Sequence, residues 1–401
     1  MDSLHVTSEI GKLDTVLLKR PGSEFLYLTP RNMDRLLFDD IPYLEEAQAE
    51  HDSFADALRR NGVRVVYLDE LLEETLRKSS PARDFIVNEW VNGIPDSCPA
   101  DTCDIRDGIS DLNFSHWVES LVETMISGAM ENHGLYAGDV DPIPNLYFTR
   151  DTFTVIGNRV LFNAMSTETR RREAIFFDTV LRYNDGYSGH TALYANEHRG
   201  NRARTIEGGD ILILSGDTLA IGMSERTQLG GVLDIAKWIF GDEESGFRKI
   251  LVFTVPRARA CMHLDTVITQ LDTESFVCYK PWANGTSVYE ITPGKVPSSC
   301  SVSELDGEIR EILASALRIP SVRLIYCGGG DEIAGEREQW SDGSNVLAIE
   351  PGKVISYDRN RVTNHYLDIA GIEVIEIPSG ELSRGRGGAH CMSMPLIRQD
   401  I

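Results

Sequence analysis

The stretch DILILSGDTLAIGMS, residues Asp210–Ser224, sets out the unit from which this chain is built. Two β-rich runs flank a short turn, a pattern typical of a β-hairpin. A helix-like segment, RTQLGGVLDIAKWIFG, follows over residues 226–241, and the strand-like run KILVFTV occupies residues 249–255. The pattern therefore predicts a unit of strand, strand, helix and strand.

The hairpin pattern recurs elsewhere along the chain. It appears in TFTVIGNRVLFN from Thr152, DTVITQLDTESFVCY from Asp265 and NVLAIEPGKVISYD from Asn345. The N-terminal part repeats the theme less clearly, with a strand-like run, a helix-like run and VRVVYL over residues 63–68. The unit is thus expected about five times, and repeated units of this size usually stack around an axis or along a line.

One segment departs from the repeat. From about Leu71 to Asp141 the sequence has helix-like runs and few β-rich ones, which predicts a helical insertion. Its acidic loop, PDSCPADTCDIRDG over residues 95–108, is expected to be an exposed connection. We therefore expect a first module over residues 1–70, an inserted helical domain over 71–143, and the remaining modules over 144–401.

Composition indicates a soluble globular protein. Of 401 residues, 42% are hydrophobic and 25% charged, and the net charge of −23 argues against binding to nucleic acids or anionic membranes. Seven scattered cysteines without a CxxC pair indicate reduced thiols and no structural zinc site of common spacing. The N-terminus lacks the features of a signal peptide, and no apolar run could span a bilayer. A cytoplasmic location is expected.

Three polar residues stand directly before three of the predicted hairpins. Asp151, Glu207 and His263 follow one another at intervals of 56 residues (207 − 151 = 56 and 263 − 207 = 56). Equivalent positions in units arranged around an axis would converge on one centre. The sequence therefore predicts a site that contains two acids and a histidine.

A fourth fragment, GRGGAHCMS over residues 385–393, adds a cysteine behind glycines and an arginine. Glycines allow a ligand to approach the backbone closely, and cationic neighbours favour a thiolate. Taken singly, Cys391 could be a buried core cysteine and His263 a satisfied core histidine. A zinc site built from cysteine, histidine and carboxylates is the other chemical reading.

Together, FTRD (148–151), EGGD (207–210), MHLD (262–265) and GRGGAHCMS resemble the fragments of the arginine deiminases in order and separation. The resemblance covers nearly the whole chain, including a helical insertion after the first module. It implies the fold of the guanidino-group modifying superfamily: a five-bladed α/β propeller of ββαβ modules with pseudo-fivefold symmetry. It also implies conversion of L-arginine and water to L-citrulline and ammonia, with no metal or other cofactor, by a homo-oligomer.

The resemblance assigns roles that suit the chemistry of a planar cation. Asp151 and Asp265 would bind the guanidinium, because carboxylate oxygens match its N–H fork. Cys391 would be the nucleophile and form a covalent S-alkylthiouronium. His263, oriented by Glu207, would transfer protons, and its charge or that of the substrate would lower the pKa of the thiol.

The same resemblance implies a subsite for the amino-acid end of the substrate. Its carboxylate would be bound by Arg226, by Arg386 in a glycine-rich gate, and by Arg170 or a neighbour in the run Arg170–Arg172. Asn145 would lie near the backbone end, and Phe148 would pack on the aliphatic stem. His390 receives no role, since consecutive side chains of extended backbone point in opposite directions.

Two kinds of alternative remain open from the residues alone. The first is a related guanidine-modifying activity: a dimethylarginine or agmatine hydrolase, or an amidinotransferase. The second is a binding protein with a degenerate site, which would not need a nucleophile.

Overall fold

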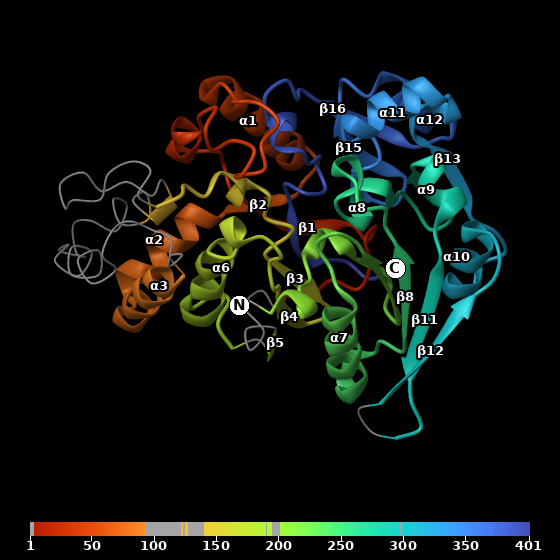
Figure 1. Ribbon diagram of the computed structural model, residues 1–401, viewed down its shortest axis with the longest axis horizontal. Helices are drawn as coiled ribbons and strands as arrows, with labels where there is room; N and C mark the ends of the chain where they lie inside the picture. Colours follow the sequence, from red (N-terminus) through yellow and green to blue (C-terminus); the bar gives the residue numbers. More distant parts are fainter. Residues whose placement is uncertain are drawn as a thin grey trace.

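The structure is a computed structural model that describes residues 4–93, 122, 125–126, 140–189, 191–194 (backbone only), 201–296 and 299–401. Its described strands form five separate sheets. In Figure 1 strands such as β1, β3 and β4 lie toward the middle of the molecule, and helices such as α1, α7, α10 and α12 lie toward its margin. No helix of the described ranges is both long enough and apolar enough to cross a membrane.

One pattern recurs in all five sheets. A middle strand pairs antiparallel with one neighbour and parallel with the other. In four of the sheets a hairpin produces the antiparallel pair, and in all five a helical crossover returns the chain parallel to the middle strand. The predicted order of strand, strand, helix and strand is therefore present in four units, and the fifth has the same strand pairing.

Two units follow this order without interruption. They consist of β3 (Phe153–Ile156), β4 (Arg159–Phe162), α6 (Glu173–Tyr183) and β5 (Thr191–Tyr194), then β6 (Ile211–Ser215), β7 (Thr218–Met223), α7 (Leu229–Gly241) and β8 (Lys249–Thr254). In the first hairpin the turn residue Gly157 has a φ of +60°, a conformation that glycine adopts without strain. Every residue of β3 and β4 is buried, so these strands are covered on both faces.

The next two units carry additions. The first has β9 (Ile268–Gln270), β10 (Ser275–Cys278) and β13 (Arg323–Tyr326), with α9 (Lys280–Gly285), β11 (Val288–Pro293), β12 (Cys300–Leu305) and α10 (Ile309–Leu317) between the last two strands. Strands β11 and β12 extend the neighbouring sheet by pairing with β8, which the sequence pattern did not indicate. The second has β14 (Leu347–Glu350), β15 (Lys353–Tyr357), α12 (Arg361–Ile369) and β16 (Glu373–Ile377), and the helix α11 (Glu332–Trp340) precedes it.

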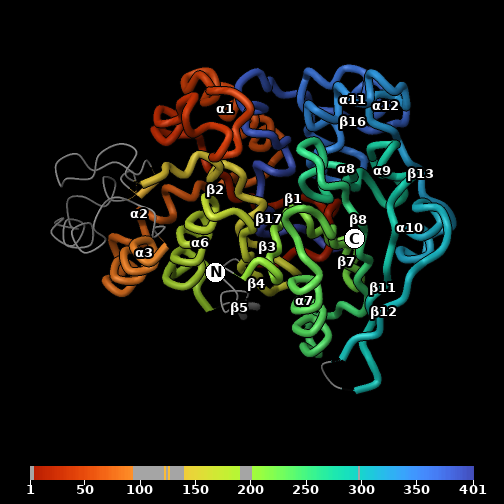
Figure 2. The backbone as a smooth tube through the Cα atoms, viewed as in Figure 1, coloured from red at the N-terminus to blue at the C-terminus, as the bar shows by residue number. Residues whose placement is uncertain are grey.

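The fifth unit is assembled from both ends of the chain. Strand β1 (Leu13–Leu18) is its middle strand, and α1 (Leu44–Arg60) leads to the parallel strand β2 (Arg64–Tyr67). The antiparallel partner of β1 is β17 (Met394–Arg398), and Leu13 lies opposite Arg398. Figure 2 shows the two strands together near the middle of the molecule. The weak N-terminal repeat in the sequence is thus a unit whose missing strand comes from the C-terminus.

The helical segment after β2 is described in part. Helix α2 (Leu68–Lys78) and α3 (Ser80–Asn92) pack against α6. Helix α3 begins where the hydroxyl of Ser79 accepts the N–H of Ala82, a typical N-cap, and Pro81 follows in the first turn. The predicted loop over 95–108 and most of the predicted helical insertion after residue 93 lie outside the described residues.

Candidate active site

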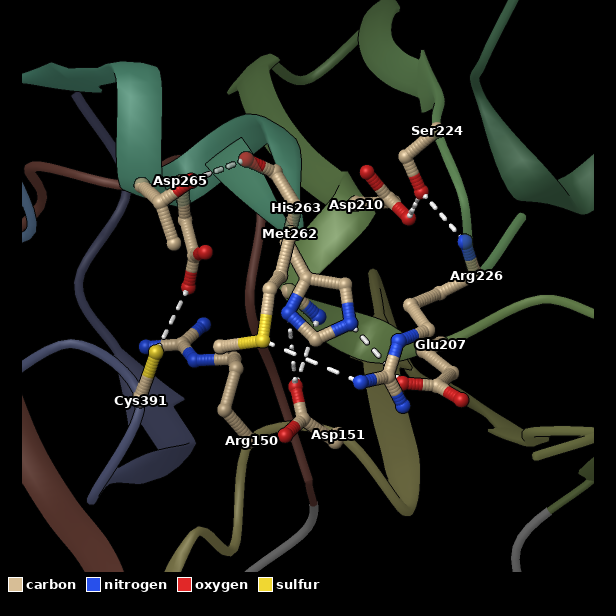
Figure 3. A network of polar contacts seen from close by, with 12 residues as sticks. Arg150, Asp151, Glu207, Asp210, Ser224, Arg226, Met262, His263, Asp265 and Cys391 are labelled. Carbon is tan, nitrogen blue, oxygen red and sulfur yellow. Dashed lines mark hydrogen bonds and ion pairs between the residues drawn. The ribbon is translucent and has the colours of Figure 1, made fainter. Parts of the chain in front are cut away.

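The side chains that the sequence predicts to act in catalysis lie on short loops directly before strands. Asp151 precedes β3, Glu207 precedes β6, His263 precedes β9 by one helical turn, and Cys391 precedes β17. Each is at most 3% exposed. Figure 3 shows Cys391 and Asp265 on one side of the His263 imidazole and Glu207 on the other.

Glycines allow these loops to meet. A Cβ atom on Gly209 would lie 2.8 Å from Nδ1 of His263 and 3.0 Å from Oδ1 of Asp151. A Cβ atom on Gly208 would collide with the backbone oxygen of Arg150. The glycines of the EGGD fragment are therefore needed for close approach, and neither has a positive φ.

His263 and Glu207 form a buried ion pair. Nε2 of His263 lies 2.8 Å from Oε2 of Glu207, and Nδ1 lies 3.8 Å from Oδ1 of Asp151. Burial opposes charging of the imidazole, but the charge of Asp151 and the bond to Glu207 prevail and raise the pKa of His263 to about 9. Burial likewise opposes ionisation of Glu207, but the hydrogen bond from His263 lowers the pKa of Glu207 to about 2. At neutral pH this site therefore holds an imidazolium, which is a competent general acid.

Asp265 contacts the predicted nucleophile. Its Oδ2 accepts hydrogen bonds from Sγ of Cys391 at 3.4 Å and from Nδ1 of His390 at 2.8 Å. Its Oδ1 is buried and has no hydrogen-bond partner among the described residues. One carboxylate oxygen is thus committed to the protein, and the other is available to a bound molecule.

The thiol is protonated in the unliganded site. Burial, followed by the negative charges of Asp265 and Asp151, raises the pKa of Cys391 well above its ordinary value. The nearby imidazolium of His263 does not outweigh these effects. Of the two sources of activation considered from the sequence, the structure therefore favours the charge of an incoming cation.

Backbone contacts fix the cysteine loop. The side-chain oxygen of Asn345 accepts the N–H groups of Cys391 and Gly388, and its amide donates to the backbone oxygen of Asp265. Asn345 lies at the start of a predicted hairpin, as Asp151 and His263 do, and this shared position was the only signal for it in the sequence. It ties the nucleophile to its neighbouring carboxylate.

The position of His390 contradicts the expectation that its side chain points away from that of Cys391. Residues 389–392 form a turn, in which the N–H of Met392 bonds to the carbonyl of Gly388. The alternation of an extended strand therefore does not apply here, and His390 and Cys391 both contact Oδ2 of Asp265.

Two of the three predicted carboxylate-binding arginines have unused donors. Arg226 and Arg386 are 3% and 4% exposed, and Nε and Nη1 of each lack a hydrogen-bond partner among the described residues. The guanidinium of Arg386 lies 3.8 Å above the ring of Trp340, and the backbone of Arg386 has a φ of +66°. Such buried donors are suited to an anionic group.

Arg170 is held differently. Its Nη1 donates to Oδ2 of Asp151 at 2.7 Å, while its Nε and Nη2 donate to Glu173. All three nitrogens are engaged by protein carboxylates, so its role as a carboxylate ligand stays a prediction. Arg259 was not identified from the sequence. Its Nη1 lies 3.1 Å from Sδ of Met262, and Nη2 of Arg226 lies 3.7 Å from the same sulfur.

Two further predicted residues line the neighbouring loops. The amide of Asn145 donates to the backbone oxygen of Leu36 at 2.7 Å. Phe148 packs against Tyr147, with ring centroids 4.0 Å apart, and a Cβ atom on Gly387 would collide with its ring. Within the described ranges, no three histidine, cysteine, aspartate or glutamate side chains are grouped so as to hold a metal ion.

Comparisons with known proteins agree on one family. The family model described as arginine deiminase matches residues 34–101 and 111–398. Arginine deiminases from Treponema denticola and Clostridium perfringens are each 42% identical to this chain, over 100% of its length and 100% and 99% of their own.

Solved structures support the fold. An amidinotransferase from the saxitoxin pathway of Microseira wollei matches with a TM-score of 0.57 and 15% identity, over 99% of this chain and 98% of its own. A dimethylarginine dimethylaminohydrolase bound to S-methyl-L-thiocitrulline matches with a TM-score of 0.53 and 15% identity, over 95% of this chain and 99% of its own. At this identity the likeness shows a shared α/β fold alone.

Proposed function

Since the chain belongs to the arginine deiminase family, we propose that it hydrolyses L-arginine to L-citrulline and ammonia through a covalent adduct on Cys391. One observation supports the roles proposed for Asp265 and Cys391. Asp265 bonds the thiol through Oδ2 and keeps Oδ1 buried and free beside it. A guanidinium bound at Oδ1 would lie next to the sulfur that attacks it.

Binding prepares the first chemical step. The guanidinium pairs with Asp265 and Asp151 and offsets the negative charges that keep Cys391 protonated. The pKa of the thiol falls, the thiol releases its proton, and the thiolate attacks the central guanidinium carbon. As the C–N bond breaks, the imidazolium of His263 gives its proton to the departing nitrogen, which leaves as ammonia.

The second step restores the enzyme. Neutral His263 takes a proton from water, and the resulting hydroxide attacks the same carbon of the S-alkylthiouronium. The C–S bond then breaks as the C=O bond forms, the hydroxyl proton passes to the departing sulfur, and the ureido group of citrulline remains. Glu207 holds the imidazole in place during both transfers. The substrate brings its own positive charge, so the proposal requires no metal or other cofactor.

A direct experiment can detect the proposed intermediate. The enzyme is mixed with L-arginine, quenched in acid within one turnover, digested and examined by mass spectrometry. The peptide that contains Cys391 should gain the mass of arginine minus ammonia. Citrulline production with no such adduct at any quench time would contradict covalent catalysis.

Arg226 and Arg386 are proposed to bind the substrate carboxylate, with Asn145 and Phe148 around its backbone and stem. The variant Arg226→Ala should raise KM for L-arginine about 10- to 100-fold, because a bidentate charged hydrogen bond is lost. Agmatine has no carboxylate, so kcat/KM for any residual turnover of it should change little. Steady-state kinetics with both substrates checks this, and equal losses for the two would contradict the assignment.

We also propose how the modules are arranged and where the protein acts. The five ββαβ units would close into a five-bladed propeller, with residues 71–143 as an inserted helical domain between a first module (1–70) and the others (144–401). The protein would act in the cytoplasm as a homo-oligomer, without nucleic acid or membrane partners. The five cysteines in the described part of the chain are unpaired, which fits a reducing compartment.

A further inference from the structure

His390 and Glu9 form a buried pair behind Asp265. They are 2% and 5% exposed, and Nε2 of His390 lies 3.0 Å from Oε2 of Glu9. The other ring nitrogen lies 2.8 Å from Oδ2 of Asp265. A neutral imidazole has one N–H and can donate only one of these bonds. Both bonds can be donated at once only when both ring nitrogens carry a proton.

Other contacts hold this pair in place. Oε1 of Glu9 accepts the N–H of Ile213 at 3.0 Å. Arg150 donates to the backbone oxygen of His390 at 3.3 Å, and its Nη1 lies 3.9 Å from Glu9. The buried Arg398 adds a second positive charge near Glu9. Glu9 is consequently ionised, with its pKa lowered to about 2 by His390 and these arginines against the effect of burial.

The geometry constrains the side chain of Asp265. Its Oδ2 is shared by His390 and Cys391, as Figure 3 shows for the cysteine, so rotation of the carboxylate would break both bonds. In this orientation Oδ1 is the oxygen left for a ligand. We propose that His390, held by Glu9, is a positioning residue that keeps Asp265 ionised and turned toward the substrate guanidinium. This inference rests on the role proposed for Asp265.

A comparison within the site supports the charge effect. Burial raises the pKa of Asp265, but the hydrogen bond from His390, with the charges of His390, His263 and Arg150, leaves it below the ordinary value. Asp210 is equally buried and also lies near the charge of His263, but its hydrogen bonds come from the hydroxyl of Ser224 and the N–H of Leu264. There burial dominates and raises the pKa to about 7. Without His390, the pKa of Asp265 should move in the same direction.

The variant His390→Gln tests the inference, because glutamine can donate one hydrogen bond but carries no charge. We expect kcat/KM for L-arginine to fall about 10- to 100-fold at pH 8, since the carboxylate is less well oriented. The ratio of variant to wild-type kcat/KM should fall about another tenfold by pH 6, as Asp265 takes up a proton. Taking the ratio cancels every ionisation that the two proteins share.

Two more variants complete the experiment. Glu9→Gln should also lower the ratio of variant to wild-type kcat/KM between pH 8 and pH 6, but by less, because the amide oxygen still accepts a hydrogen bond from the ring. His365→Gln, on the exposed surface of α12, should match the wild type at every pH. A ratio independent of pH in a folded His390→Gln protein would overturn the proposal. If that variant does not fold, as judged by circular dichroism, a Glu9→Gln ratio independent of pH would overturn it instead.

The result is separable from the catalytic proposal. Cys391→Ala is assayed alongside, and persistent activity in that protein would reject the proposed mechanism itself. An inactive Cys391→Ala protein together with pH-independent ratios would reject only the role of His390.

Discussion

Cys391→Ala is expected to release citrulline from L-arginine at least about 10⁴-fold more slowly than the wild type. The reason is that no other nucleophile replaces the sulfur. Sγ is the only group described as bonded to Oδ2 of Asp265 apart from the ring of His390, and that ring is held between two carboxylates. Water attacking the resonance-stabilised guanidinium directly would lack the covalent route.

The measurement is citrulline formation over hours, with protein of matched concentration and circular dichroism spectrum. Cys300→Ala is the matched control, because this partly buried cysteine on β12 lies at the edge of another sheet. It should retain wild-type turnover. Citrulline release by Cys391→Ala at even a tenth of the wild-type rate would remove the cysteine from the mechanism.

His263→Ala is expected to lower kcat about 10³-fold or more with a small change in KM. Both half-reactions lose their proton carrier, whereas Asp151 and Asp265 remain to bind the cation. Because burial is outweighed by Asp151 and Glu207, the pKa of His263 is about 9. The wild-type kcat/KM should therefore decline above about pH 9, where the general acid of the free enzyme is deprotonated, and the variant should lack that decline.

Stopped assays of kcat and KM from pH 6 to 10 check this prediction. His365→Ala removes an exposed imidazole on α12 and serves as the control. A raised KM with an unchanged kcat would show that His263 acts in binding and not in proton transfer.

The hairpins and the fragments of the site were predictable because each depends on residues that are close together in the sequence. The β-rich runs in residues 153–162 and 211–223, and the turn residues between them, determine hairpins that depend on residues only a few positions apart. The fragments around Asp151, Glu207, His263 and Cys391 could be singled out for the same reason. Each is a short run of glycine, acidic, histidine or cysteine residues directly before a strand.

Other features of the site gave no such signal. Arg170 was expected to face a substrate carboxylate, but carboxylates of the protein engage its donors. His390 was set aside on the rule for extended strands, which a turn at residues 389–392 invalidates. Charge and hydrogen-bond capacity can be read from a residue type, but the partner that satisfies them cannot.

The amino-acid sequence alone determined the strand–strand–helix–strand unit, its repetition and the residue types needed to attack a guanidinium. Only the tertiary structure decided that β17 supplies the outer strand of the first unit, and that Glu9 reaches His390 across the full length of the chain. The physical reason is distance along the chain. Periodicity and turn chemistry act between neighbours, whereas contacts between the two ends depend on how all the intervening units pack.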